Sequence, residues 1–186
     1  VVGEIGHTTV KKDWPQCFCG NRGCLEVMCS VDTIIKQCKE LLKAGKCTEL
    51  KKILDKKITN NKYEDKNMVS EDEKYDLISY DMVLEAFNAG DENVRSVLEE
   101  CGEYLGIGIA NIINIFNPTR IIINGDILLN SDFIYKKALE EAKLRAYEQF
   151  TKVLTFNKVK IDIEKAIRGI SLYVTDKIFD LMGPEI

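Results

Sequence analysis

The chain has 186 residues, enough for one domain with a substantial buried core, and its 45% hydrophobic and 30% charged residues are ordinary for a globular protein. A net charge of -4 and a pI near 5.2 argue against a nucleic-acid surface on this chain, because phosphate binding needs clustered positive charge. No apolar run approaches the roughly 18 residues that a membrane span needs, and the N-terminus lacks a signal-peptide pattern, so we expect no membrane partner.

The seven cysteines do not have the spacing of a secreted disulfide framework. Four of them fall in or beside predicted helices: Cys29, Cys38, Cys47 and Cys101. We expect these to be free thiols, as in the reducing cytoplasm, and we therefore predict a cytoplasmic protein. The other three lie close together near the N-terminus.

The first part of the chain is predicted to be an irregular, glycine-rich segment followed by helices. Apolar residues recur at helical spacing over residues 25–42, with Ser30 as an N-cap for the second part of that stretch and Gly45 after its end. Residues 46–58 favour a short helix. The polar and charged run 59–74 predicts an excursion at the surface.

The next stretch contains two predicted helices with N-caps. Ser79 precedes one of them, and Asp91 opens a long helix that ends before Asn117-Pro118. Three glycines lie in the middle of the long helix, between residues 102 and 108. Because each glycine costs about 1 kcal/mol relative to alanine in a helix, we expect a neighbouring backbone to approach closely there.

The last part of the chain alternates strands and helices. The apolar run 121–123 predicts a strand buried on both faces, followed by a turn at 124–126. We expect a helix over 133–150, an alternating strand over 159–163 and an amphipathic helix over 166–182. This order of helices and strands indicates the α/β class, and no internal repeat is evident.

One group of side chains has the composition of a metal site. His7, the only histidine, is followed by Cys17, Cys19 and Cys24, with glycines between the second and third sulfurs. Three thiolates and one imidazole form the closed shell of a structural zinc site, and soft thiolates select zinc over magnesium or calcium. The pattern predicts a structural zinc ion that orders this loop. The alternative is a core histidine beside unrelated thiols.

Two acids are held near that group by the chain itself. Glu4 precedes His7 by three residues, and Glu26 follows Cys24 by two. Carboxylates accept strong hydrogen bonds from hydroxyl groups, so anchored acids suit a polyol such as a sugar. The spacing also fits a solvated surface acid at Glu4 and an acid favoured by the helix dipole at Glu26.

These residues resemble a known family. The strings GEIGH (residues 3–7) and CFCGNRGCLE (residues 17–26) are similar to the signature of the ROK family of repressors, open reading frames and kinases. Further similarity lies in YLGIGIAN (104–111), FNP (116–118) and AIRG (166–169). The resemblance covers essentially the whole chain.

The resemblance implies an α/β fold, the C-terminal lobe of the actin-like, ribonuclease-H-like ATPase architecture. Residues 1–186 would form a sugar-binding and oligomerisation lobe, with residues 1–26 as its zinc-binding and sugar-contact segment. Within that segment the family pattern implies sugar contacts for Glu4, His7 and Glu26. It also implies a homo-oligomer, either a dimer or a tetramer.

Two departures from the family pattern affect the function. The chain begins inside the signature, so we expect a lobe with the phosphate-binding loop and the catalytic base upstream of it, and we assign no catalytic residue here. Kinases of the family carry consecutive glycines after the buried strand, where nucleotide lies near the backbone. Asn124, Gly125 and Asp126 occupy that nucleotide-loop position, and the negative charge of Asp126 disfavours a polyphosphate.

The resemblance leaves two functions open. The first is the sugar-sensing lobe of a transcriptional repressor of carbohydrate metabolism, similar to N-acetylglucosamine or xylose-operon repressors, with DNA bound only through an upstream domain. Thr8-Thr9-Val10 after His7 and the 124–126 turn favour this branch. The second is the C-terminal lobe of an ATP-dependent, glucokinase-like sugar kinase. The sequence does not specify the sugar.

Overall fold

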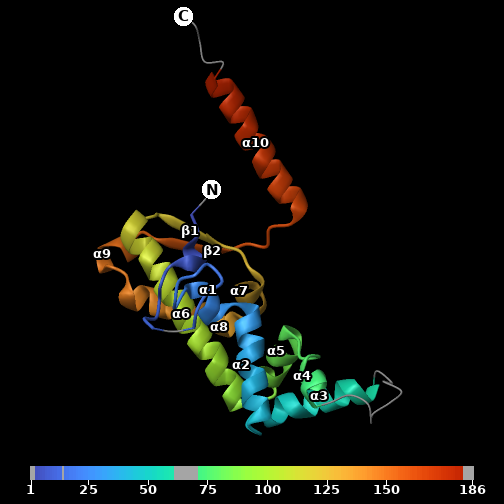
Figure 1. Cartoon of the computed structure of the whole chain (residues 1–186). Helices are drawn as coiled ribbons and strands as arrows, with labels where there is room; N and C mark the ends of the chain where they lie inside the picture. Colours follow the sequence, from blue (N-terminus) through green and yellow to red (C-terminus); the bar gives the residue numbers. More distant parts are fainter. Residues whose placement is uncertain (1–2, 14, 61–70, 182–186) are drawn as a thin grey trace, which may run out of the picture.

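The computed structural model describes residues 3–13, 15–60 and 71–181 (Figure 1). Its elements in chain order are η1 (Ile5–His7), α1 (Leu25–Cys29), α2 (Val31–Lys43), α3 (Thr48–Asn60), α4 (Glu71–Tyr75), α5 (Tyr80–Asn88), α6 (Glu92–Phe116), β1 (Arg120–Ile123), α7 (Asp126–Asn130), α8 (Asp132–Arg145), α9 (Glu148–Thr151), β2 (Thr155–Lys158) and α10 (Ile163–Leu181). Helices dominate and a small parallel sheet accompanies them, which confirms the predicted α/β class.

Helix α6 runs through the centre of the fold (Figure 1), and the buried Asp91 begins it as predicted. Oδ1 of Asp91 accepts hydrogen bonds from the backbone N–H groups of Asn93 and Val94, both at 3.2 Å. Its Oδ2 accepts from the N–H groups of Glu49 and Leu50 at 3.0 and 3.3 Å. One carboxylate therefore caps α6 and the start of α3 together, which fixes these two helices relative to each other.

The predicted close approach of a neighbouring backbone is found at Gly102 and Gly106, whereas the neighbour of Gly108 is a side chain. Gly102 and Gly106 face α8, and a Cβ on Gly106 would lie only 2.8 Å from the carbonyl oxygen of Ala138. Gly108 faces α1, where a Cβ would lie 2.6 Å from a methyl group of Leu25. The absence of side chains lets α6 pack tightly between α1 and α8, and α1 carries part of the candidate site.

The helical stretch predicted over residues 25–42 consists of α1 and α2, which meet at the predicted N-cap Ser30. Its hydroxyl accepts a hydrogen bond from the backbone N–H of Thr33 at 3.2 Å. Gly45 follows α2 with a φ of +72°, a left-handed conformation that glycine adopts at little cost. The break at Ser30 turns the chain directly beside the N-terminal loop.

The next segment agrees with the predictions in part. Helix α3 confirms the short helix expected over 46–58, and Ser79 precedes α5, although its side chain makes no capping hydrogen bond. The surface excursion predicted over 59–74 lies largely outside the described residues, which resume at residue 71, the start of α4.

Strands β1 and β2 form a parallel pair in which Ile121 lies opposite Phe156. The strand predicted over 159–163 is wrong in position, because β2 lies four residues earlier and Ile163 already begins α10. Apolar and polar residues alternate both within β2 and after its end at Lys158, so this alternation does not show where the strand ends. Parallel pairing with the short strand β1 determines which residues form β2. After β2, Val159 extends this pairing, because its N–H donates to Ile123 O at 2.9 Å.

The prediction that β1 is buried on both faces is also wrong. Ile123 is buried, whereas Ile122 is 59% exposed. Successive side chains of a strand point to opposite faces of the sheet, and in the part of the chain that the structure describes only one face of this sheet is covered by helices.

The helix predicted over 133–150 is interrupted between α8 and α9. The side chain of Asn114 on α6 accepts a hydrogen bond from Tyr147 N at 2.7 Å and donates one to Arg145 O at 3.3 Å. These bonds satisfy backbone groups that the break releases from the helix, so a contact distant in sequence stabilises the interruption.

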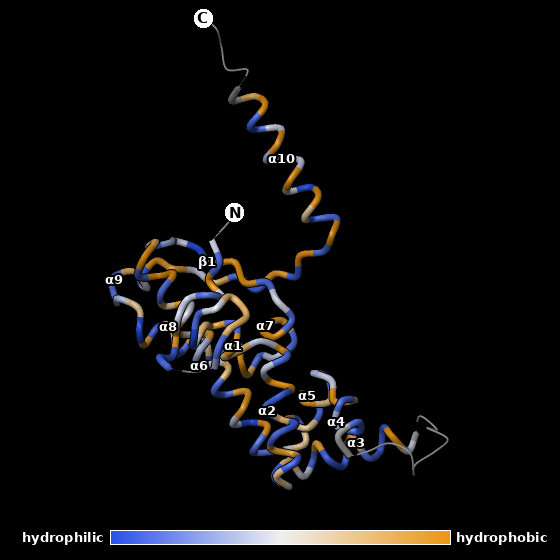
Figure 2. The backbone as a smooth tube through the Cα atoms, in the orientation of Figure 1, coloured by the Kyte–Doolittle hydropathy of each residue, from blue (hydrophilic) through white to orange (hydrophobic). Residues whose placement is uncertain are grey.

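Helix α10 projects away from the body of the fold (Figure 1) and confirms the predicted helix as far as residue 181. Figure 2 shows apolar and polar positions interspersed along it. Several of its large apolar side chains are exposed, including Ile163, Ile167, Ile170, Tyr173 and Phe179. Among the described helices none combines the length and the apolar character required to span a membrane.

Candidate metal centre and adjoining cavity

The four predicted metal ligands lie together at the N-terminus of the described chain. The ligand atoms of His7, Cys17, Cys19 and Cys24 all lie within 4.8 Å of one another. Sγ of Cys17 is 3.6 Å from Nδ1 of His7, and Sγ of Cys19 is 3.7 Å from Sγ of Cys24. A single metal ion could therefore be held by all four side chains.

Two glycines shape the loop that carries the sulfurs. Gly20 and Gly23 have φ values of +91° and +66°. A Cβ on Gly23 would lie 1.7 Å from the carbonyl oxygen of Lys11, whereas a Cβ on Gly20 would meet no atom within 4 Å. A bridge between Thr9 and Cys24 lies next to this close approach. The chain reverses here, which brings the sulfurs close together.

Asn21 organises the same loop, although no role was predicted for it. Its side-chain amide donates to Sγ of Cys24 at 3.3 Å and to Oγ1 of Thr9 at 2.9 Å. Its carbonyl oxygen accepts from the N–H of Cys17 at 2.8 Å. Bonds of this kind orient metal ligands from outside the shell. Its position between the second and third sulfurs is the only sequence signal that points to it.

The thiols influence one another's ionisation. A hydrogen bond from the backbone N–H of Asn21 lowers the pKa of Cys19. Burial, reinforced by the neighbouring thiols of Cys19 and Cys17, raises the pKa of Cys24 to about 11. Thiolates this close repel one another, and a bound cation would neutralise that repulsion. Metal binding would therefore release protons and weaken as the pH falls.

A cavity of about 430 Å³ adjoins the ligand cluster, within the size range of small-molecule sites. Its walls come from η1, α1, the start of α2, α6 and the turn before α7. Most of the lining is apolar: Ile5, Leu25, Val31, Leu105 and Ile127, with the Cys29 thiol. The remaining positions are Gly6, Ser30, Gly125, Glu26 and Asp126. Leu105 and Ser30 had been predicted only as helix positions, because sequence periodicity does not show which residues of a helix border a cavity.

Glu26 is the predicted sugar-contact residue that lines this cavity. It lies in the first turn of α1, which the ligand Cys24 precedes as N-cap. Its Oε2 lies 3.1 Å from the point where a Cβ on Gly6 would be, so the carboxylate packs against the backbone of η1. Because Cys24 directly precedes α1, the metal-ligand loop fixes the position of the Glu26 carboxylate.

Glu4 and His7 flank the η1 residues that line the cavity. The carbonyl oxygen of Glu4 accepts a hydrogen bond from the N–H of His7 at 3.2 Å, and its exposed side chain lies outside the lining. The half-buried imidazole of His7 directs Nδ1 toward Cys17, and its ring meets the Phe18 ring edge-on at 5.0 Å. The second ring nitrogen of His7 is then available to another partner.

Two of the three residues at the nucleotide-loop position line the cavity, and the third makes a structural hydrogen bond. Gly125, at a φ of +149°, and Asp126 line the cavity. Oδ1 of Asn124 accepts a hydrogen bond from Ile161 N at 3.3 Å. Asn124 therefore anchors the segment that leads into α10, and Asp126 places a carboxylate at the cavity.

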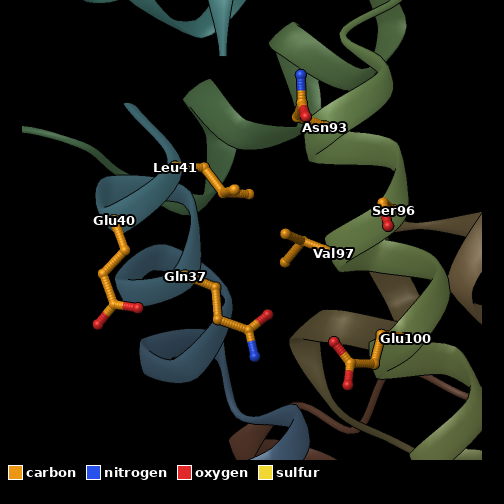
Figure 3. A pocket seen from close by; sticks show the side chains of 7 residues that line it. All are labelled: Gln37, Glu40, Leu41, Asn93, Ser96, Val97 and Glu100. Carbon is orange, nitrogen blue, oxygen red and sulfur yellow. The ribbon is translucent and has the colours of Figure 1, made fainter. Parts of the chain in front are cut away.

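A second pocket of about 390 Å³ lies between α2 and α6 (Figure 3). Leu41 and Val97 face each other across it, and Glu40 and Glu100 stand at its edges. Nζ of Lys11 lies 3.8 Å from the Glu100 carboxylate. No residue of the metal cluster or of the nucleotide-loop position borders this pocket.

Comparison with known proteins places the chain in a family. The model of the ROK family matches residues 1–177. The chain is 29% identical over 163 residues to the xylose repressor of Caldicellulosiruptor bescii, which covers 88% of the chain and 35% of that protein. It is 30% identical over 172 residues to the DNA-binding transcriptional dual regulator NagC of Escherichia coli K12, covering 92% of the chain and 36% of that protein. The chain thus spans little more than a third of the length of these relatives.

Solved structures share the fold. A ROK family transcriptional regulator, a homologue of the E. coli MLC protein, matches 84% of the chain and 34% of its own length, with a TM-score of 0.59 and 25% identity. The ROK hexokinase of Thermus thermophilus matches 91% of the chain and 47% of its own length, with a TM-score of 0.64 and 20% identity. These likenesses bear out the predicted lobe of the actin-like ATPase fold, and with the family match over residues 1–177 they show that this chain belongs to the ROK family.

Proposed function

We propose that this chain is the sugar-sensing and oligomerising lobe of a ROK-type transcriptional repressor of carbohydrate metabolism. The observation that carries the proposal is the position of Glu26, which lines an apolar cavity two residues after the metal ligand Cys24. A carboxylate beside apolar walls suits a polyol, because the hydroxyl groups of a polyol donate hydrogen bonds to the carboxylate and its C–H groups pack against the apolar walls. Relatives of this chain that bear the names xylose repressor and NagC support the regulatory branch.

Zinc is the metal that the ligand cluster fits best. With Zn–S bonds of about 2.3 Å and Zn–N bonds of about 2.0–2.1 Å, a tetrahedral shell separates two sulfurs by about 3.8 Å and a sulfur from a nitrogen by about 3.6 Å. The Cys19–Cys24 and Cys17–His7 separations are 3.7 and 3.6 Å. Four protein ligands leave no open position, so the ion would be structural and would order the loop that positions Glu26.

The sugar would contact the cavity from the side of η1 and α1. Glu26 would accept hydrogen bonds from hydroxyl groups inside the cavity. If Nδ1 of His7 binds the metal, its Nε2 carries the proton and can donate to a hydroxyl at the edge of η1. Glu4, which precedes η1, is the third proposed contact, and the direction of its exposed side chain supports this role less strongly.

Sugar binding would regulate the protein by shifting a conformational equilibrium. A ligand that binds one form more tightly than the other increases the population of that form. In relatives about two and a half times as long, DNA contact would come from a segment outside these 186 residues, consistent with the acidic pI near 5.2 of this chain. We further propose that the protein is cytoplasmic, because repressors act on intracellular DNA and none of the seven cysteines forms a disulfide. We also propose a homo-oligomer, a dimer or tetramer, as the family resemblance implies and as is common for soluble proteins.

The alternative function is the C-terminal lobe of an ATP-dependent sugar kinase, which the fold likeness to the ROK hexokinase favours. Asp126 opposes it, because a carboxylate at the nucleotide-loop position repels phosphates. An assay for ATP-dependent phosphorylation of glucose, xylose and N-acetylglucosamine by the full-length protein, which includes the upstream lobe, discriminates between the two. Sugar-dependent ATP consumption would favour the kinase.

The proposed function is tested by titrating the chain with those three sugars and comparing Glu26→Ala with a matched control. Loss of the carboxylate should weaken binding at least tenfold, as expected for about 1.4 kcal/mol or more from a charge-assisted hydrogen bond, without releasing zinc. Glu100→Ala removes an acid at the other pocket and should leave the affinity unchanged. Equal sugar affinity in wild type and Glu26→Ala would contradict the proposal.

A further inference from the structure

The cavity beside the metal cluster has charged residues of one sign only. Among the residues that line it, Glu26 and Asp126 are the charged ones, and both are acids. They approach it from different elements, since Glu26 lies in the first turn of α1 and Asp126 begins α7. In the described part of the chain, no lysine or arginine forms an ion pair with either carboxylate.

A phosphorylated ligand meets two obstacles in such a cavity. A phosphate monoester carries roughly two negative charges near neutral pH, and proteins bind it with cationic side chains or with clustered N–H donors. The lining offers no cationic side chain, and α7, with five residues, is too short to supply a strong helix dipole. Asp126 is exposed, so solvent and salt weaken its repulsion of a phosphate, but the interaction still disfavours phosphate binding.

Asp126 is the first residue of α7, a first-turn position at which the helix dipole favours a carboxylate. It is exposed to the solvent of the cavity and follows Gly125, where an added Cβ would meet no atom within 4 Å. Its neighbour Asn124 makes the hydrogen bond that anchors the chain at Ile161. Because no ion pair in the described part of the chain engages it, the Asp126 carboxylate can also act on a ligand in the cavity.

We propose that Asp126 is a specificity-determining residue that restricts the cavity to uncharged, unphosphorylated sugars and rejects sugar phosphates. This inference rests on the proposed sugar-sensing function and narrows its ligand class. Glu26 of α1 accepts hydroxyl groups of the ligand, while Asp126 of α7 accepts a hydroxyl of a neutral ligand or repels a phosphate. The repressor accordingly responds to the sugar before its phosphorylation, so that a sugar kinase would consume the inducing signal.

The test is a calorimetric titration of the chain with matched pairs: glucose and glucose 6-phosphate, N-acetylglucosamine and its 6-phosphate, xylose and xylose 5-phosphate. Wild type should bind the free sugar at least about tenfold more tightly than its phosphate, and Asp126→Asn should reduce that ratio at least about threefold, more at low than at high salt. Asp81→Asn is the matched control, because Asp81 is a first-turn acid of α5 outside this cavity. It should leave the ratio unchanged.

Each other outcome overturns a defined part of the account. Tighter or equal binding of the phosphate by wild type contradicts the proposed ligand class, although sugar sensing itself would stand. A ratio that Asp126→Asn does not change removes the role of Asp126. If the chain binds neither member of any pair, the sugar-sensing function fails, and the inference that depends on it fails with it.

Discussion

Substitution of the two glycines in the metal-binding loop should have very different effects, because only one of them touches another part of the chain. Gly20 and Gly23 both have positive φ, and an alanine in this left-handed region costs about 1–2 kcal/mol. At Gly20 this strain is the whole cost, since its Cβ would meet open space. Gly20→Ala should therefore weaken zinc binding about tenfold, because loop folding and metal binding are coupled.

Gly23→Ala carries a further cost. Its Cβ would lie 1.7 Å from Lys11 O, so the backbone must move, and two hydrogen bonds to Gly23 O, from Val10 N at 2.8 Å and Lys11 N at 3.3 Å, are lost. At about 1 kcal/mol for each bond, the total approaches about 3–4 kcal/mol, or on the order of 300-fold in zinc affinity.

Competition for zinc between each variant and a chromogenic chelator measures this difference directly. Wild type, Gly20→Ala and Gly23→Ala should rank in that order, with the larger step between the two variants. If Gly23→Ala binds zinc as tightly as Gly20→Ala, the close approach to Lys11 does not hold the ligand loop together and the reasoning is refuted.

Three further predictions concern the scaffold and the metal. Asp91→Ala should lower the free energy of unfolding by about 3–5 kcal/mol in urea titrations, because four backbone N–H groups lose their acceptor; an unchanged midpoint would contradict the double cap. Gly106→Ala should destabilise by about 1–3 kcal/mol through overpacking against α8, whereas Gly169→Ala, in open space on α10, should increase helical circular dichroism. Chelation of zinc should make residues 7–24 protease-sensitive, and unchanged cleavage after verified metal removal would count against metal-ordered folding.

The features that could be predicted from sequence are those set by local chemistry. The ligand spacing of His7 and the cysteines, the caps at Ser30 and Asp91, and the glycines of α6 each depend on residues close in sequence or on a backbone that must approach closely. These signals survive without knowledge of the fold, because a cap or a tight turn requires the same residue types in any context.

The features that were missed depend on contacts distant in sequence. The break between α8 and α9 needs Asn114, which lies more than 30 positions away from Arg145 and Tyr147. The position of β2 is decided by its pairing with β1. The cavity joins α1, α6 and the turn before α7, so its apolar lining, and the approach of Asp126 to the same space as Glu26, appear only when these elements are packed.

The central claim is that one imidazole and three thiolates close around a single zinc ion beside the cavity. X-ray absorption at the zinc edge, on chain purified without added metal, tests it most directly. The account predicts one zinc ion per chain with three sulfur neighbours at about 2.3 Å and one nitrogen at about 2.0–2.1 Å. A chain that retains no zinc, or a zinc ion surrounded by oxygen ligands alone, would contradict it.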